Sequence, residues 1–281
     1  MKIMHTHDPG DWTAVNEEVT AMIKKWYQKL DFPKAYDAEF YHALSEIRIS
    51  DATSIEKYDL SSTDGKRNLL SMLFMCESLA EKYRERGIGE AVLLATLSDL
   101  VIWTNTWSEI KGELYLGELD WLKRHLEIRL FRLGRLQFCM GQAECDIPGR
   151  GVKAGDNVLE IHIPEGEPLS KEACLQSIEA AKKFFKAYFP EFDYKCFTCH
   201  SWLLDASLEK FLKPESNILQ FGRMFDAVHV EKSDAILRYL FRWDTTRSNL
   251  EFAVPYNHFT EAVKGHVMQG EECYEVLGVL R

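Results

Sequence analysis

The sequence lacks several features that define large classes of proteins. None of its apolar runs reaches the roughly 18 residues of a membrane-spanning helix, and the opening residues MKIMHTHDPGDW contain no apolar segment typical of a secretory signal. Basic residues are not in excess either: the formal net charge is -10, with 13 basic and 21 acidic residues up to Asp120 and 21 basic and 23 acidic residues after it. Because nucleic-acid binding needs a basic surface, we expect no nucleic-acid partner. The lack of an apolar span and of a signal segment favours a cytoplasmic protein with no membrane partner.

Internal repeats, low-complexity runs and flexible linkers are also lacking. The 281 residues are 46 % hydrophobic and 28 % charged, which is close to the average of globular proteins. A chain of this length forms one large domain or two ordinary ones, and a change in its hydrophobic spacing favours two. We therefore expect a helical domain over residues 1–125 and an α/β domain over residues 126–281.

The first half has almost no strand pattern. In residues 11–30 the apolar side chains recur at helical spacing and form one stripe, which comprises Val15, Val19, Met22, Ile23 and Trp26. Gly87 is the expected end of a second helix, because it follows basic residues suited to a helix C-terminus. The pattern predicts four helices in this half, over residues 11–30, 65–87, 89–107 and 117–129.

The second half alternates short strands with helices, which indicates an α/β or α+β domain. Strands are expected in residues 130–138, 157–164, 195–204 and 226–231 and at the end of the chain, in residues 273–280. Helices are expected over residues 170–189 and 206–212 and from about Phe259. The fold class predicted from the residues is thus an all-helical part followed by a mixed sheet with helices.

The seven cysteines are scattered singly, except in the stretch YKCFTCHSWLLD, where Cys196, Cys199 and His200 have the C-x-x-C-H spacing of a haem attachment site. A haem would need an oxidising compartment and a second ligand, and a redox dithiol would need a helix start, whereas these residues have a strand pattern. A zinc site from Cys139, Cys145, Cys196 and Cys199 stays open as an alternative. The simplest interpretation is that the thiols are small core residues, with no metal and no haem.

Two other segments have the chemistry of a ligand site. RERGIG, residues 84–89, matches a phosphate-binding loop, but helices on both sides favour a helix-to-helix turn with Gly87 as its cap. Glu160 and His162 share one face of the strand NVLEIHIP, and His162 lies at its carboxyl end. Because α/β sheets bind ligands beyond those ends, Glu160 and His162 are candidate site residues, although a lone strand histidine is more often structural.

Four blocks of the second half, RLFRLGRLQF, IHIPEGEPLS, SWLLDASLEKFL and SNILQF, resemble a bacterial family of two-domain, acyltransferase-like proteins. Its members have a helical N-terminal domain and a GNAT-like C-terminal domain. The resemblance covers most of residues 126–225. The helical half is similar only in its general helical pattern and contains no motif that carries the resemblance. The resemblance implies an N-acyltransferase that moves an acyl group from acyl-coenzyme A, as co-substrate, to a small-molecule amine acceptor.

The resemblance also implies roles for individual residues. The strands 157–164 and 195–204 would splay apart to form the slot for the pantetheine arm of coenzyme A. Glu160 or His162 would be the general base, and Cys199 or Ser201 would orient the substrate or protonate the departing thiolate. The expected coenzyme A-binding residues are Glu165, Gly166, Leu169, Ser170 and Arg135. Glu165 and Glu167 would repel a pyrophosphate unless Arg129, Arg132 or Arg135 compensate.

Three hypotheses follow for the function. The first is the acyltransferase, and the second is a non-catalytic ligand-binding or interaction protein that retains a GNAT-like fold, which the acidic loop favours. The third is a zinc-stabilised domain built on the cysteines of residues 139–199.

Overall fold

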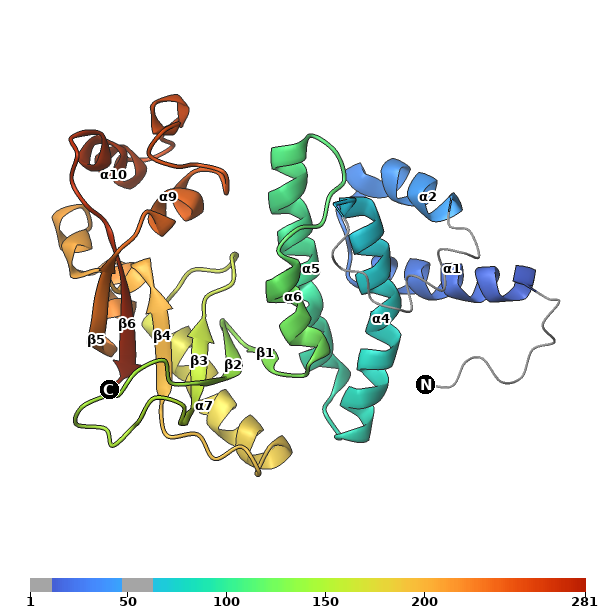
Figure 1. Ribbon diagram of the computed structural model, residues 1–281, viewed down its shortest axis with the longest axis horizontal. Helices are drawn as coiled ribbons and strands as arrows, with labels where there is room; N and C mark the ends of the chain where they lie inside the picture. The colour runs from blue at the N-terminus through green and yellow to red at the C-terminus, as the bar shows by residue number, and fades with distance from the viewer. Residues whose placement is uncertain (1–11, 47–62) are drawn as a thin grey trace. The chain divides into compact units, whose positions relative to one another are not determined.

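The computed structural model describes residues 12–46 and 63–281 of the chain (Figure 1). They form two compact units, Met1–Ile128 and Arg129–Arg281. Within the described residues, no helix is both long enough and apolar enough to cross a membrane.

Every described element of the first unit is helical. These elements are α1 (Trp12–Lys29), η1 (Lys34–Tyr36), α2 (Asp37–Ser45), α4 (Gly65–Glu85), α5 (Glu90–Lys111) and α6 (Leu119–Leu126). The predicted stripe of α1 is buried at Val19, Ile23 and Trp26, and α1 packs against α4. The side chain of Val15 lies outside the described residues. Helix α2 was not expected from the sequence.

RERGIG forms the turn between α4 and α5. Gly87 has a φ of +73°, a left-handed conformation that favours glycine. The backbone N–H of Ile88 donates to the carbonyl of Tyr83 (2.9 Å), and that of Gly87 donates to the carbonyl of Arg84 (3.0 Å). These bonds are those of a helix C-terminal cap, so the helix-to-helix interpretation of this segment is confirmed.

A buried carboxylate joins α5 to α6. Oδ2 of Asp99 accepts hydrogen bonds from the indole Nε1 of Trp121 (2.9 Å) and from Nε2 of His125 (3.1 Å). Asp99 and His125 are almost fully buried. A buried charge is tolerated only where donors satisfy it, so these two donors position the short helix α6 on α5.

The second unit is built on one sheet of six strands in the order β1-β2-β3-β4-β6-β5. The strands are β1 (Leu130–Leu133), β2 (Leu136–Gln142), β3 (Asn157–His162), β4 (Phe197–Ser201), β5 (Phe225–Lys232) and β6 (Tyr274–Leu280). Only β3 and β4 are parallel neighbours, and the other adjacent strands are antiparallel. The mixed sheet after a helical unit confirms the predicted fold class.

Two expected strands differ in detail. Residues 130–138 form a hairpin instead of one strand, because Gly134 turns the chain between β1 and β2 with a φ of +78°. The strand expected over residues 195–204 ends at Ser201 and continues as the 3-10 helix η2 (Trp202–Leu204). There, the Ser201 hydroxyl accepts the N–H of Leu203 (3.1 Å), which turns the backbone out of the sheet.

Helix α7 (Lys171–Tyr188) contacts β1 and β2 on one face of the sheet. An aromatic cluster fills this contact, with Phe131 of β1 against Phe184, Phe185 and Phe189. On the opposite face, Val158 and Val279 are covered by apolar residues of the connection between β2 and β3, namely Ala143, Ile147 and Val152.

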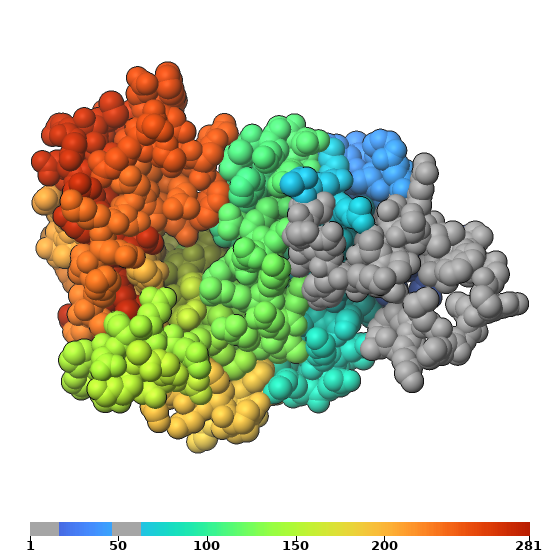
Figure 2. Space-filling model, viewed as in Figure 1, coloured from blue at the N-terminus to red at the C-terminus, as the bar shows by residue number. Residues whose placement is uncertain are grey.

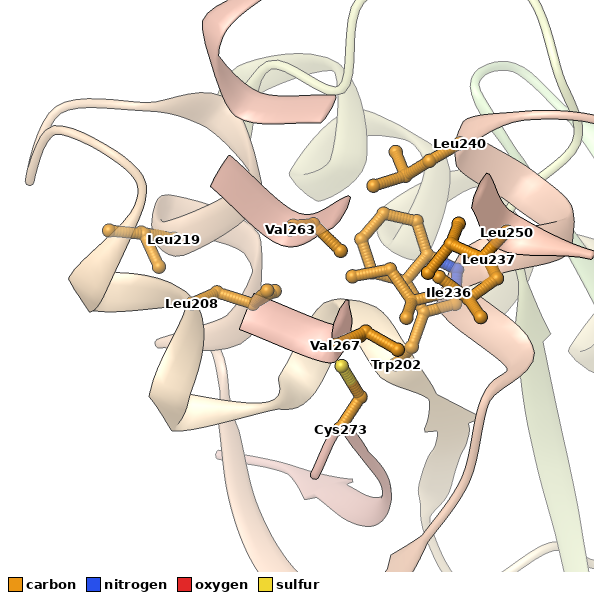
Figure 3. Close-up of a cluster of buried hydrophobic side chains, with 10 residues drawn as sticks. All are labelled: Trp202, Leu208, Leu219, Ile236, Leu237, Leu240, Leu250, Val263, Val267 and Cys273. Carbon is orange, nitrogen blue, oxygen red and sulfur yellow. The ribbon is translucent and has the colours of Figure 1, made fainter. Parts of the chain in front are cut away.

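A second core lies beyond the end of β4. The elements around it are η3 (Ala206–Lys210), α8 (Asn217–Gly222), α9 (Ala235–Leu240), η4 (Leu250–Phe252) and α10 (His258–Met268). Trp202, the first residue after β4, lies among aliphatic side chains that include Leu237, Leu240 and Val263 (Figure 3). The orange and red segments that contain α9 and α10 form the upper surface of this unit in Figure 2.

Candidate active site

The parallel strands β3 and β4 separate before either of them ends. They pair at only two positions, Leu159 with Phe197 and Glu160 with Thr198. Beyond these positions β3 continues to His162 in register with β2, and β4 continues to Ser201 in register with β6. The sheet therefore splits between β3 and β4 at their carboxyl ends, as expected for the slot that the family resemblance implies.

Glu160 and His162 lie together at this split. Nε2 of His162 is 3.4 Å from Oε2 of Glu160, and each side chain is 28 % exposed. Strand alternation places both on the same face of β3, the face opposite α7. A partly exposed imidazole beside a carboxylate is accessible to a ligand and can exchange a proton with it.

Cys199 and Ser201 do not join this pair. Thr198 is the residue of β4 in register with Glu160, so Cys199 and Ser201 point to the opposite face. Cys199 is fully buried, and burial raises the pKa of its thiol far above the usual value. The hydroxyl of Ser201 accepts the N–H of Leu203. The structure therefore brings neither side chain to His162.

His200 shares the face of Glu160 and His162, and sequence reasoning did not select it. Its Nε2 is 3.2 Å from Oε1 of Glu231 on β5. Because β6 lies between β4 and β5, the His200 side chain reaches across β6 and leans away from β3. Strand alternation could have predicted the face on which His200 lies, but only the ion pair with Glu231 shows the direction of its side chain.

The loop from β3 to α7 contains four of the residues expected to bind coenzyme A. Ser170 caps α7, with its Oγ accepting the N–H of Ala173 (3.2 Å), and Leu169 is buried beside it. Glu165 and Gly166 are exposed, and Gly166 has a φ of +129° that only glycine adopts readily. The loop thus places an exposed glycine shortly before the start of the 18-residue helix α7. The first N–H groups of a helix attract anions.

Arg135 lies beneath this loop. It is only 7 % exposed, and its Nη1 donates to the carbonyl of Pro164 (2.8 Å), two residues after the end of β3. Its Nε is buried with no hydrogen-bond partner among the described residues. Burial lowers the pKa of this guanidinium below the usual value, yet arginine stays charged at neutral pH. The nearby Glu167 opposes this shift, so the buried positive charge partly balances that carboxylate.

The described residues contain no group of three or more His, Cys, Asp or Glu side chains that could hold a metal ion. The seven cysteines all lie in the described part of the chain, and none is joined in a disulfide. Cys139 is in register with Glu160, whereas Cys199 points to the other face of the sheet. These two buried thiols are therefore on opposite sides, and the arrangement does not assemble the four-cysteine zinc site considered above.

The strand order, the split between β3 and β4 and the loop before α7 are those of a GNAT-like domain. A family model described as the GNAT-like C-terminal domain matches residues 130–280, and the N-acyltransferase N-terminal domain matches residues 5–128. The chain therefore belongs to the two-domain acyltransferase family that these domains form. No match was found among curated proteins.

Several solved structures with a similar fold are described as acyltransferases. One, in complex with decanoyl-CoA, is 25 % identical and has a TM-score of 0.75, with 92 % of this chain and 86 % of that chain covered. Another, in complex with decanoyl-CoA and teicoplanin, is 22 % identical with a TM-score of 0.75 and coverage of 96 % and 94 %. A third, in complex with CoA and 10C-teicoplanin, is 21 % identical, also with a TM-score of 0.75 and the same coverage.

Proposed function

We propose that this protein transfers an acyl group from acyl-coenzyme A to the amine of a small-molecule acceptor. The observation that carries the proposal is the split between β3 and β4 with the Glu160–His162 pair at its edge. Family membership and the acyl-CoA complexes of similar structures support the same donor.

In this proposal the donor binds along the split and the loop. Backbone groups of β3 and β4 that do not pair with each other beyond Glu160 and Thr198 would bind the amides of the pantetheine arm. The pyrophosphate would lie at the start of α7, where helix N–H groups and the loop around Gly166 bind anions. Arg135 and Arg132 would supply the positive charge that offsets Glu165 and Glu167.

His162 would act as the general base. As the amine nitrogen attacks the thioester carbonyl, a carbon–nitrogen bond forms and His162 accepts a proton from that nitrogen. The carbon–sulfur bond then breaks, and the thiolate leaves with a proton from solvent or from the imidazolium. Glu160 would orient the ring and stabilise its positive charge. We do not assign Cys199 or Ser201 a role in this step, because both point to the other face of the sheet.

The acceptor is proposed by class only. The similar structures include complexes with teicoplanin and 10C-teicoplanin, so a relative of this fold accommodates a small-molecule compound beside the acyl donor. For this chain we propose an amine-bearing small molecule as the acceptor.

Replacing His162 with alanine tests the catalytic role. We expect turnover to fall by about a hundredfold or more, the usual effect of losing a general base, with little change in melting temperature because the side chain is partly exposed. His200→Ala is the matched control, since it removes a histidine of the same face that leans away from β3. Full activity in His162→Ala, or an equal loss in His200→Ala, would exclude the role.

The non-catalytic hypothesis is favoured by one observation, the two exposed glutamates of the loop before α7. Thermal shifts with a series of acyl-coenzyme A esters separate it from the first proposal. A ligand at a hundred times its dissociation constant stabilises the folded state by about 2.7 kcal/mol. Stabilisation with turnover supports the transferase, whereas stabilisation without turnover of any amine tested supports the binding protein.

A further inference from the structure

The carboxylate of Glu160 occupies the space in which a side chain of Gly141 would stand. Gly141 lies on β2, in register with Val158 of β3. A Cβ atom built on it would lie 2.0 Å from Oε1 and 2.5 Å from Cδ of Glu160. Real Cβ atoms essentially never approach a heavy atom closer than 3.0 Å. Any other residue at this position would therefore displace the carboxylate.

The backbone does not itself require glycine here. Gly141 is absent from the positive-φ residues of the chain, so its conformation is that of an ordinary strand residue. Glycine in the interior of a strand weakens it and often marks a close approach of another group. The only atoms that approach this close to the missing side chain are those of Glu160. The close contact with Glu160 therefore accounts for a residue that the strand would otherwise disfavour.

The two oxygens of the carboxylate have different neighbours. Oε1 lies against Gly141, and Oε2 lies 3.4 Å from Nε2 of His162. The other residue of β2 beside Glu160 is Cys139, which is in register with it and fully buried on the same face. Because Gly141 has no side chain, the Glu160 carboxylate can lie against β2 at this position while its Oε2 stays beside the imidazole of His162.

We propose that Gly141 is a positioning residue that keeps Glu160 in contact with His162. This inference rests on the proposed function, because Gly141 can affect catalysis only if His162 is the general base that Glu160 orients. A methyl group at Gly141 meets the end of a flexible, 28 % exposed side chain rather than backbone. The glutamate therefore yields before the sheet does, and moves toward solvent.

Gly141→Ala tests this proposal. We expect turnover to fall by about tenfold or more, since misplacement of a reacting arrangement by about 1 Å costs up to about a hundredfold. The melting temperature stays near that of the wild type, and a crystal structure of the variant shows Oε2 of Glu160 displaced from Nε2 of His162. The matched control is Gly265→Ala in α10, where an added Cβ meets no atom within 4 Å; its activity is unchanged.

A double-mutant cycle shows whether Gly141 acts through Glu160. In a Glu160→Ala background the space beside Gly141 is vacant, so adding Gly141→Ala causes no further loss of activity. An equal loss in both backgrounds, an undisplaced carboxylate, or failure of both Gly141→Ala and the double variant to fold overturns the proposal. Should Gly141→Ala alone fail to fold, the double variant shows by its folding whether the collision with Glu160 was the cause.

The same set of variants separates this proposal from the proposed function. Wild-type activity in Glu160→Ala removes any purpose for Gly141 in catalysis and overturns the inference, while the effect of His162→Ala still decides the transferase independently. Loss of activity in His162→Ala and Glu160→Ala with full activity in Gly141→Ala overturns only the inference.

Discussion

At the scale of single residues, burial determines which thiols are chemically available. Cys76 and Cys199 are fully buried, and burial raises the pKa of each thiol far above its usual value. Burial also raises the pKa of Cys174 to about 11, although the nearby Arg135 partly opposes this effect. Because the thiolate is the reactive form, none of these three side chains is a ready nucleophile at neutral pH.

Alkylation of the native protein should follow this order. We expect iodoacetamide at pH 8 to modify the half-buried Cys145 and Cys196 first, and Cys76 and Cys199 only after unfolding. Peptide mass spectrometry at increasing times measures the order, with urea-unfolded protein as the control in which all thiols react. Early modification of Cys199 would contradict the placement of its side chain inside the unit.

Arg135 gives a second prediction at this scale. In Arg135→Met the loop loses its buried charge, so coenzyme A should bind about tenfold or more weakly, as measured by calorimetry. Stability should change by less than about 2 kcal/mol, because the lost bond to Pro164 is offset by removal of a buried charge. Arg135→Lys, which retains the charge, is the control. Unchanged affinity in Arg135→Met would show that the charge does not serve the ligand.

At the scale of elements, the contact between α1 and α4 should make the first unit sensitive to acid. Glu77 of α4 accepts hydrogen bonds from Lys25 (2.7 Å) and Trp26 (2.9 Å) of α1. Burial opposes ionisation, but these bonds outweigh it and hold the pKa of Glu77 below its usual value of 4.5. The folded state thus binds fewer protons at this carboxyl than the unfolded state does.

The stabilising effect of Glu77 is therefore complete above pH 4.5 and is lost as the pH falls through the lower folded pKa. Urea unfolding between pH 7 and pH 3 should show a steeper loss of stability in the wild type than in Glu77→Gln. Glu81→Gln, an exchange of the same type in α4, is the control. Parallel curves for the wild type and Glu77→Gln would contradict the prediction.

Elements with long periodic patterns could be predicted from the sequence, and those set by local polar contacts could not. The apolar stripe that includes Ile23 and Trp26 predicted α1, and the apolar run of residues 273–280 predicted β6. The end of β4 was placed three residues too late, because apolar alternation continues through Trp202 while the Ser201 hydroxyl turns the chain. Helix α2 was missed because it is short, with buried apolar residues only at Phe40 and Leu44.

The candidate site shows the same division between local pattern and long-range geometry. Alternation predicted that Glu160 and His162 share a face, since both lie on one strand. The residue of β4 that joins that face depends on the register between two strands separated by α7, and no local pattern encodes it. Sequence reasoning therefore chose Cys199 and Ser201, whereas the register places Thr198 beside Glu160 and puts His200 on the same face of the sheet. The space at Gly141 is likewise visible only once β2 and β3 are paired.

At the scale of the whole molecule, all the residues proposed to bind and activate the donor belong to one unit. The split between β3 and β4, the start of α7, Arg135 and the Glu160–His162 pair all lie within Arg129–Arg281. This unit has its own cores, one around Trp202 and one around Val158. The two family models also divide the chain near this point, with one ending at residue 128 and the other beginning at residue 130.

A fragment of residues 129–281 should therefore fold by itself and bind acyl-coenzyme A. A domain with its own hydrophobic core is able to fold independently, and a bound donor should protect the amides of β3, β4 and the start of α7 from hydrogen exchange because it pairs with them. Exchange measured by mass spectrometry on the fragment and on the full chain, each with and without decanoyl-CoA, tests both points. We expect the same protected peptides in both proteins, and in the His162→Ala variant as well, since that side chain serves the acceptor step. If the fragment folds but shows no protection while the full chain is protected, the helical unit contributes to donor binding. An unfolded fragment would show that Arg129–Arg281 is not an independent domain.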